Sequence, residues 1–224
     1  MVDTIRVEGV DATSYLQGQV SQDVESLAVG GEAWSYVLAP NGHIDGFVLV
    51  RRTGDESFEL DIDAGFGEQV ETRLRRFLLR TKATITLAPT SAADPDDSSE
   101  VERIRTGRPA MGKDIDERSV PAELGWLDRA VSFTKGCYVG QELVARMDSR
   151  VAEPPRRLVR LAIDGDAAAG AEVVVDDVAV GAVTSAAPLD GGAIALGYVK
   201  RGTDLGGRAT VGGANARIEG VAGA

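Results

Sequence analysis

Cysteine and histidine are the scarcest reactive residues of this 224-residue chain, in which Cys137 and His43 occur once each. A single cysteine excludes an internal disulfide and fits a reducing compartment, so we expect a cytoplasmic protein. One cysteine and one histidine also fall short of the ligand set of a structural zinc site or an iron–sulfur cluster. We therefore expect no metal site formed by this chain alone.

Long apolar runs and clustered positive charge are missing as well. No stretch approaches the roughly 18 apolar residues that a membrane span needs. Asp3, Arg6 and Glu8 interrupt the N-terminal segment where a signal peptide would be apolar. The formal net charge is -11, and the basic residues do not form the clusters that neutralise phosphates. We expect neither membrane nor nucleic acid among the partners, and we expect a monomer.

Hydrophobic periodicity divides the chain into a mixed part and a β part. In the mixed part, alternation predicts strands at 4–8, 34–38, 43–52, 57–62 and 81–87, with a turn at Pro40-Asn41-Gly42. Helices are predicted at 12–17 with Asp11 as the cap, at 21–27 with Ser21 as the cap, and at 66–79, 100–106 and 141–147. Residues 88–100 lack periodicity and are the best linker in the chain.

The β part follows the EPPR segment at 153–156. Short strands are predicted at 158–163, 172–175, 178–185, 193–199, 209–211 and 214–219, separated by Gly and Asp turns. Their number and shortness indicate a small β-barrel or sandwich. In the mixed part, the 66–79 helix places Val70, Leu74, Phe77 and Leu78 on its buried face and Arg73 outside.

Cys137 lies in the stretch KGCYVGQE, residues 135–142. Gly136 and Gly140 permit backbone conformations closed to other residues. The helix that begins near Gln141 directs unpaired N–H groups at the loop, and its dipole together with Lys135 favours a thiolate. Such a loop suits a reactive thiol. A lone cysteine is otherwise most often a small buried apolar residue, and this alternative stays open.

His43 and Asp45 are two residues apart in the segment NGHID. On a strand this spacing can place both on one side, as a base and the group that orients it. The alternative is a polar hairpin tip. A Cys–His hydrolase would require Cys137 and His43 to meet in space, and nothing local supports that. The glycines match no nucleotide-binding pattern.

The stretch KGCYVGQELVAR, residues 135–146, resembles the signature of the YgfZ family. These proteins are folate-binding relatives of the glycine-cleavage T-protein, an aminomethyltransferase, and they assist iron–sulfur cluster assembly and repair. Other segments resemble the family in the same order, so the resemblance covers most of the chain: 7–31, 75–85, RIRTGRPAMGKDI at 103–115, VPAELGW at 120–126 and LGYVKR at 196–201.

The resemblance implies an α+β fold. Residues 1–152 would form a folate-binding region like that of the T-protein and YgfZ. Within it, residues 46–100 would be a shortened ferredoxin-like module and linker. Residues 153–224 would form a C-terminal β-barrel domain, in agreement with the strands predicted from periodicity.

The resemblance also implies site residues and tetrahydrofolate as the cofactor. Cys137 would be the functional thiol, and Arg146 would anchor the following helix. The loop around the thiol would be built by Lys135, Gly136, Tyr138, Gly140, Gln141 and Glu142. Asp45 matches the aspartate of the T-protein G-G-x-I-D-D segment, which assists aminomethyl transfer. Trp34 and Tyr36 would stack on the pterin or belong to the core.

Two positions depart from the T-protein. Arg105 stands where the T-protein has the acid that holds the pterin, and Gln141 stands where it has an arginine. Both losses argue against the aminomethyltransferase reaction. The resemblance therefore favours a protein that assists iron–sulfur enzymes or assembly proteins, with any cluster transient or shared with the partner. A tetrahydrofolate-dependent aminomethyltransferase or demethylase-like enzyme is the alternative, and a binding module with a structural cysteine is a third.

Overall fold

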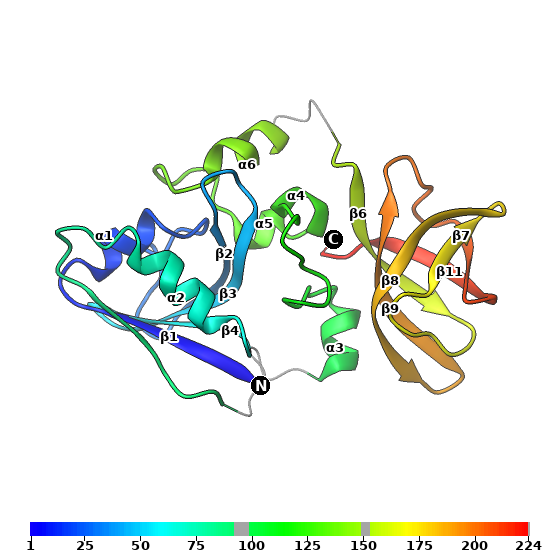
Figure 1. Ribbon diagram of the computed structural model, residues 1–224, viewed down its shortest axis with the longest axis horizontal. Helices are drawn as coiled ribbons and strands as arrows, with labels where there is room; N and C mark the ends of the chain where they lie inside the picture. Colours follow the sequence, from blue (N-terminus) through cyan, green and yellow to red (C-terminus); the bar gives the residue numbers. More distant parts are fainter. Residues whose placement is uncertain (92–98, 149–152, 224) are drawn as a thin grey trace. The chain divides into compact units, whose positions relative to one another are not determined.

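The structure is a computed structural model that describes residues 1–91, 99–148 and 153–223 (Figure 1). The chain forms two compact units. The first lies within Met1–Asp97, Glu117–Ser119 and Leu127–Arg146, and the second within Ser98–Asp116, Val120–Trp126 and Met147–Ala224. The functional division between 1–152 and 153–224 stays a prediction. Of the predicted linker, residues 92–98 lie outside the described residues.

The first unit is built on a five-stranded antiparallel sheet with the strand order β2-β3-β4-β1-β5. The strands are β1 (Val2–Glu8), β2 (Glu32–Leu38), β3 (Ile44–Gly54), β4 (Ser57–Asp63) and β5 (Thr84–Leu87), so the predicted strands are confirmed. In β1 and β4 the residues at alternate positions are fully buried, as period-two alternation requires: Ile5, Val7, Phe58, Leu60 and Ile62. In β3 the consecutive residues Phe47, Val48, Leu49 and Val50 are all buried.

The helix α2 (Gly67–Arg75) packs on this apolar face beside β1, β3 and β5 (Figure 1). A β-carbon at Gly46 would lie 2.6 Å from Val70, so the absent side chain allows α2 to approach β3. The helix is shorter than the predicted 66–79. Phe77, predicted to be inside, is 40% exposed, and Arg73, predicted to be outside, is only 4% exposed.

Two further helix predictions need correction. In α1 (Ala12–Gln17), the Asp11 carboxylate does not cap the helix but accepts the backbone N–H of Lys82 at 2.7 Å. Residues 21–27, all described, form no helix. Instead, Ser21 Oγ accepts the N–H of Tyr36 and donates to the carbonyl of Ala130, and Gln17 Oε1 accepts the N–H of Val24. These side-chain bonds replace helical ones.

Two more helices complete the first unit. The helix α5 (Leu127–Ala130) lies beside β2. The helix α6 (Gln141–Asp148) belongs to this unit as far as Arg146. The helix α6 begins where the sequence predicted, directly after Gly140.

The second unit contains a closed barrel with the strand order β10-β11-β6-β9-β8-β7 (Figure 1). Its strands are β6 (Arg156–Ile163), β7 (Glu172–Val175), β8 (Val178–Leu189), β9 (Gly192–Lys200), β10 (Arg208–Val211) and β11 (Ala214–Val221), which confirms the predicted barrel. Its interior is filled by short aliphatic side chains such as Val159, Leu161, Val183, Ala195 and Ile218.

Short helices cover part of the barrel. The helix α3 (Glu100–Arg105) lies beside β8 and β9, and α4 (Pro121–Leu124) lies beside β6. The buried carboxylate of Asp114 ties α3 to the barrel, because it accepts hydrogen bonds from Arg103 of α3 and from Thr184 and Ser185 of β8. Among the described helices, none is long and apolar enough to cross a membrane.

Candidate functional site

The Cys137 loop is fixed to the segment 18–22 of the same unit. The Lys135 ammonium donates to the carbonyls of Val20 and Gln22, at 2.9 and 2.7 Å. On either side, the N–H of Ser132 donates to the carbonyl of Ser21 and the N–H of Val139 donates to the carbonyl of Gly18. The bonds bracket Cys137 on both sides. The loop is therefore held by contacts distant in sequence.

The end of the loop is closed by Gln141. Its Oε1 accepts the N–H of Tyr138 at 3.2 Å, and its own N–H donates to the carbonyl of Tyr138 at 3.4 Å. Gly140 has φ +83°, and a β-carbon there would lie 2.6 Å from the carbonyl oxygen of Ala39. Both facts require glycine at this position, as predicted.

Gly136 does not use a backbone conformation that only glycine allows, and its predicted part in building the loop stays a prediction. Its φ lies outside the left-handed region, and no heavy atom of the described residues lies within 4 Å of a β-carbon built there. The backbone at this position is therefore open to residues other than glycine.

Cys137 itself is exposed. A buried apolar cysteine is therefore excluded. Lys135 serves first as an anchor of the loop, since its ammonium bonds two carbonyls and lies 5.3 Å from the centre of the Tyr138 ring. Burial lowers the pKa of Lys135 to about 8, against the opposing charges of Asp23 and Glu25.

The remaining loop positions differ in burial. Tyr138 is half-buried, and burial raises the pKa of its phenol to about 12, so the ring is neutral near pH 7. Glu142 and Arg146 are exposed on α6. The roles predicted for these residues stay predictions.

Asp45 occupies a β-bulge. Val37 pairs with Gly46 and Leu38 pairs with Ile44, so Asp45 is the extra residue of β3. Its carbonyl accepts a hydrogen bond from the Gln69 side chain at 2.9 Å instead of a ladder bond. Bulges turn a side chain away from the regular direction of the strand. Here the carboxylate lies 3.5 Å from Nε of Arg73.

Arg73 belongs to the candidate site, although the sequence pattern predicted that it would be exposed to solvent. Its Nε and Nη2 donate to the carbonyl of Leu38 at 3.1 and 2.8 Å, and its Nη1 donates to Oε1 of Gln19 at 3.0 Å. The guanidinium also lies 4.5 Å from the centre of the Phe77 ring. A charged residue on an amphipathic helix normally points to solvent, so the hydrophobic periodicity of this helix could not predict that Arg73 is buried.

Burial raises the pKa of Asp45, and the charges of Arg73, Arg76 and His43 oppose that rise. His43 does not orient Asp45 through a hydrogen bond among the described residues. Its Nδ1 lies 2.9 Å from the carbonyl oxygen of Glu117. The strand β3 begins after His43 and bulges at Asp45, and the pairing of these two residues as a base and its orienting group stays a prediction.

The two predicted motifs share one framework. Gly140 packs on Leu38 and Ala39, and a β-carbon at Gly42 would lie 2.5 Å from Cβ of Leu143 in α6. The turn before Asp45 thus lies against the helix that follows the Cys137 loop. The segment 18–22 contacts both parts, since its carbonyls hold the loop and the Gln19 side chain holds Arg73.

The aromatic candidates belong to the first unit and Arg105 to the second. Trp34 is half-buried and stacks on Phe47, with ring centres 4.6 Å apart. Tyr36 is fully buried, so it belongs to the core and is not a surface for a pterin. Arg105 lies on α3 in the second unit, where its guanidinium pairs with Glu102 at 2.8 Å.

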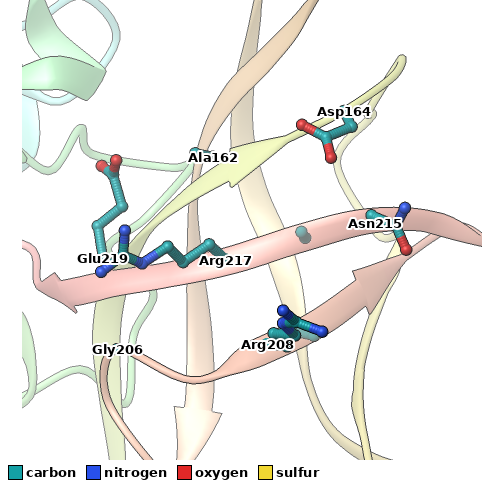
Figure 2. Close-up of a pocket in the computed structure, with 9 residues that line it drawn as sticks. Ala162, Asp164, Gly206, Arg208, Asn215, Arg217 and Glu219 are labelled. Carbon is teal, nitrogen blue, oxygen red and sulfur yellow. The ribbon is translucent and has the colours of Figure 1, made fainter.

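The second unit has a groove of about 740 Å³ on its barrel (Figure 2). Arg208 of β10 and Arg217 of β11 are register partners there, and Asp164 and Glu219 line the same groove. The two arginines and the two carboxylates of this groove balance in charge. None of the predicted site residues lines the groove. Among the described residues, no group of three or more His, Cys, Asp or Glu side chains is placed to hold a metal ion.

No family model matches the chain. It is 26% identical over 230 residues to an uncharacterized protein of Haemophilus influenzae, with 84% of this chain and 82% of that protein covered. It is 29% identical to an aminomethyltransferase of a Nostoc species, with 87% and 48% covered, so it spans about half of that protein. It is 28% identical to the tRNA-modifying protein YgfZ of Colwellia psychrerythraea, with 64% of each covered.

A solved structure shares the fold. The glycine cleavage system aminomethyltransferase T of Bartonella henselae superposes with a TM-score of 0.82 over 100% of this chain and 84% of that one, at 17% identity. This likeness confirms the predicted fold class.

Proposed function

We propose that this chain, which is similar to YgfZ and to aminomethyltransferases, is a folate-binding protein that presents the Cys137 thiol to iron–sulfur proteins. The thiol contacts the cluster, or a cysteine that binds it, while the cluster is assembled or repaired. The cluster is cargo of this protein, and most of its ligands come from the partner, because the chain has a single cysteine.

The exposed position of Cys137 in an anchored loop carries this proposal. The bonds of Lys135, Val139 and Gln141 restrict the loop around the thiol, so the loop is ordered before a partner arrives. Such preorganisation reduces the entropy lost on binding. A structural cysteine would need no such exposure.

The chemistry of the residues around Asp45 fits a pterin. Its carboxylate is 29% exposed and accepts hydrogen bonds, and the pterin ring offers N–H donors to such a group. Half-buried Trp34 offers an aromatic face. When bound, tetrahydrofolate would supply a carrier for one-carbon groups. Asp45 would orient the pterin, and Arg73 keeps a positive charge beside that carboxylate.

The thiol role is tested by complementation of a strain that lacks the gene. We expect Cys137→Ala to fold with an unchanged melting temperature, since the side chain is exposed, yet to leave cluster-dependent dehydratases at the activity of the deletion strain. Thr134→Ala is the matched control, because Thr134 is an exposed residue of the same loop. It should restore the activities, and enzymes without clusters should not change in any strain. Full restoration by Cys137→Ala would end this proposal.

The bulge at Asp45 favours a second candidate, a tetrahydrofolate-dependent one-carbon transferase. Its test is turnover of an aminomethyl or methyl donor with tetrahydrofolate, which Asp45→Asn should abolish. Arg105 and Gln141 replace the acid and the arginine of the resembling T-protein sites, so we place this function second. Absence of turnover across such donors would remove it.

A further inference from the structure

We propose that Arg73 is a positioning residue of the folate site, which fixes the direction and the ionised form of the Asp45 carboxylate so that it can accept hydrogen bonds from the ligand. This inference rests on the proposed folate function. Arg73 reaches the ligand only through Asp45.

The first observation is the geometry of the bulge. Arg73 bonds the carbonyl of Leu38 on β2 and faces the carboxylate of Asp45 on β3, so its guanidinium spans the two strands where their register shifts. The extra residue of a bulge lacks a regular cross-strand partner. Without Arg73, no other described side chain forms an ion pair with the Asp45 carboxylate.

The second observation is that Arg73 is itself fixed. Two bonds to Leu38 and one to Gln19 hold three of its nitrogens, and Arg73 is 4% exposed. A planar guanidinium held in this way presents a charge in one direction. A buried guanidinium is costly unless it is paired, so these bonds also explain how α2 tolerates an arginine at this position.

The third observation is the length of the Asp45–Arg73 contact. At 3.5 Å it exceeds the roughly 2.7–2.9 Å of a charge-assisted hydrogen bond. The attraction therefore orients the carboxylate but leaves its oxygens able to accept N–H groups from a ligand. A shorter, bidentate pair would occupy those oxygens.

The charges around Asp45 are few and can be named. Arg73 and Arg76 come from α2, and His43 precedes β3. Each opposes the effect of burial, which raises the pKa of Asp45, and Arg73 is the strongest of the three. Tyr15 on α1 faces Arg73, and burial raises its pKa to about 12, so it stays neutral near pH 7. We therefore expect removal of the Arg73 charge to raise the pKa of Asp45.

The first test needs no ligand. Carbon-13 NMR of the aspartate carboxyl groups follows the titration of Asp45 in the wild type, Arg73→Lys, Arg73→Met and Arg76→Met. We expect the pKa of Asp45 to rise most in Arg73→Met. It should rise less in Arg73→Lys, because lysine keeps the positive charge but lacks the several N–H donors of the planar guanidinium. Arg76→Met is the matched control, because it removes a nearby charge and leaves the bonds to Leu38 and Gln19. An unchanged titration in folded Arg73 variants would overturn the inference.

The second test is calorimetry with tetrahydrofolate under anaerobic conditions. We expect Arg73→Met and Asp45→Asn each to weaken binding about tenfold, the equivalent of one charge-assisted hydrogen bond. The double variant should bind no more weakly than Asp45→Asn alone, because Arg73 acts through Asp45. Additive losses would overturn the positioning role. Thermal unfolding identifies variants that fail to fold, and Arg73→Lys then provides the test.

The two experiments separate the binding of tetrahydrofolate from the effect of Arg73 on Asp45. If the wild type does not bind tetrahydrofolate, the folate part of the proposed function is wrong and the ligand role of Arg73 falls with it. The NMR titration still decides whether Arg73 controls Asp45. If the wild type binds and Arg73→Met binds equally well, only the role of Arg73 is wrong.

Discussion

The ammonium of Lys135 donates a 2.7 Å hydrogen bond to the carbonyl of Gln22, 113 residues earlier in the chain. A second bond, to the carbonyl of Val20, makes this side chain the main anchor of the Cys137 loop. Hydrogen bonds to charged groups contribute about 1.5–3 kcal/mol each when buried, and less here because the side chain is half-buried. We expect Lys135→Met to lower the free energy of unfolding in urea by about 1–2 kcal/mol.

The control for this variant is Lys82→Met, which removes an exposed lysine from the same unit. It should change stability by less than about 0.5 kcal/mol. In hydrogen exchange, Lys135→Met should also lose protection at Val139, whose N–H bonds Gly18 beside the anchor. Equal stability of both variants would show that Lys135 does not hold the loop.

The two glycines that flank Cys137 should respond differently to alanine. Gly140→Ala places a β-carbon 2.6 Å from the carbonyl oxygen of Ala39, at φ +83°. Neither backbone atom can move cheaply, so we expect a loss of about 2–4 kcal/mol in unfolding experiments. Gly136→Ala has open space and no special φ, and should be neutral within about 0.5 kcal/mol. Similar losses in both would contradict the geometry of the loop.

The strands of both units could be predicted because their pattern is local. Alternating burial in β1 and β4, and the short apolar runs of β6 and β9, are written in consecutive residues. The turn at Pro40-Asn41-Gly42 follows from residue type, and Gly42 has the positive φ that such turns use.

The centre of the candidate site could not be predicted in this way. The bulge at Asp45 is a property of the pairing between β2 and β3, which no single strand encodes. Arg73 is buried because it bonds the backbone carbonyl of Leu38, and a carbonyl has no sequence signature. Residues 21–27 have helix-like composition, but the side chains of Ser21 and Gln17 bind the backbone groups that a helix would use.

The exposed thiol leads to a prediction about reactivity. Cys137 should react with iodoacetamide in the native protein, at a rate comparable to that of the protein unfolded in urea, because no folding barrier hides it. Mass spectrometry of the intact protein would follow a single added group, and Cys137→Ser would be the blank. Modification that requires urea would contradict the exposed position and weaken the proposed contact with partner proteins.

The second unit should lose stability in acid through Glu100. Its carboxylate pairs with both Nε and Nη2 of Arg103 at 2.8 Å, and these bonds, with Lys113, lower its pKa from 4.5 to about 2. A carboxylate with a lowered folded pKa stabilises the fold above its unfolded pKa, and this stabilisation disappears as the pH falls from 4.5 to about 2. Glu100→Gln should therefore melt below the wild type at pH 6 and approach it near pH 2.

The partly exposed position of Glu100 reduces the size of this effect, because solvent screens the pair. Glu102→Gln is the matched control from the same helix, since it breaks only the exposed pair with Arg105. It should change the melting temperature little at either pH. A difference between the wild type and Glu100→Gln that stays constant from pH 6 to pH 2 would mean that the bonds to Arg103 do not favour the ionised carboxylate.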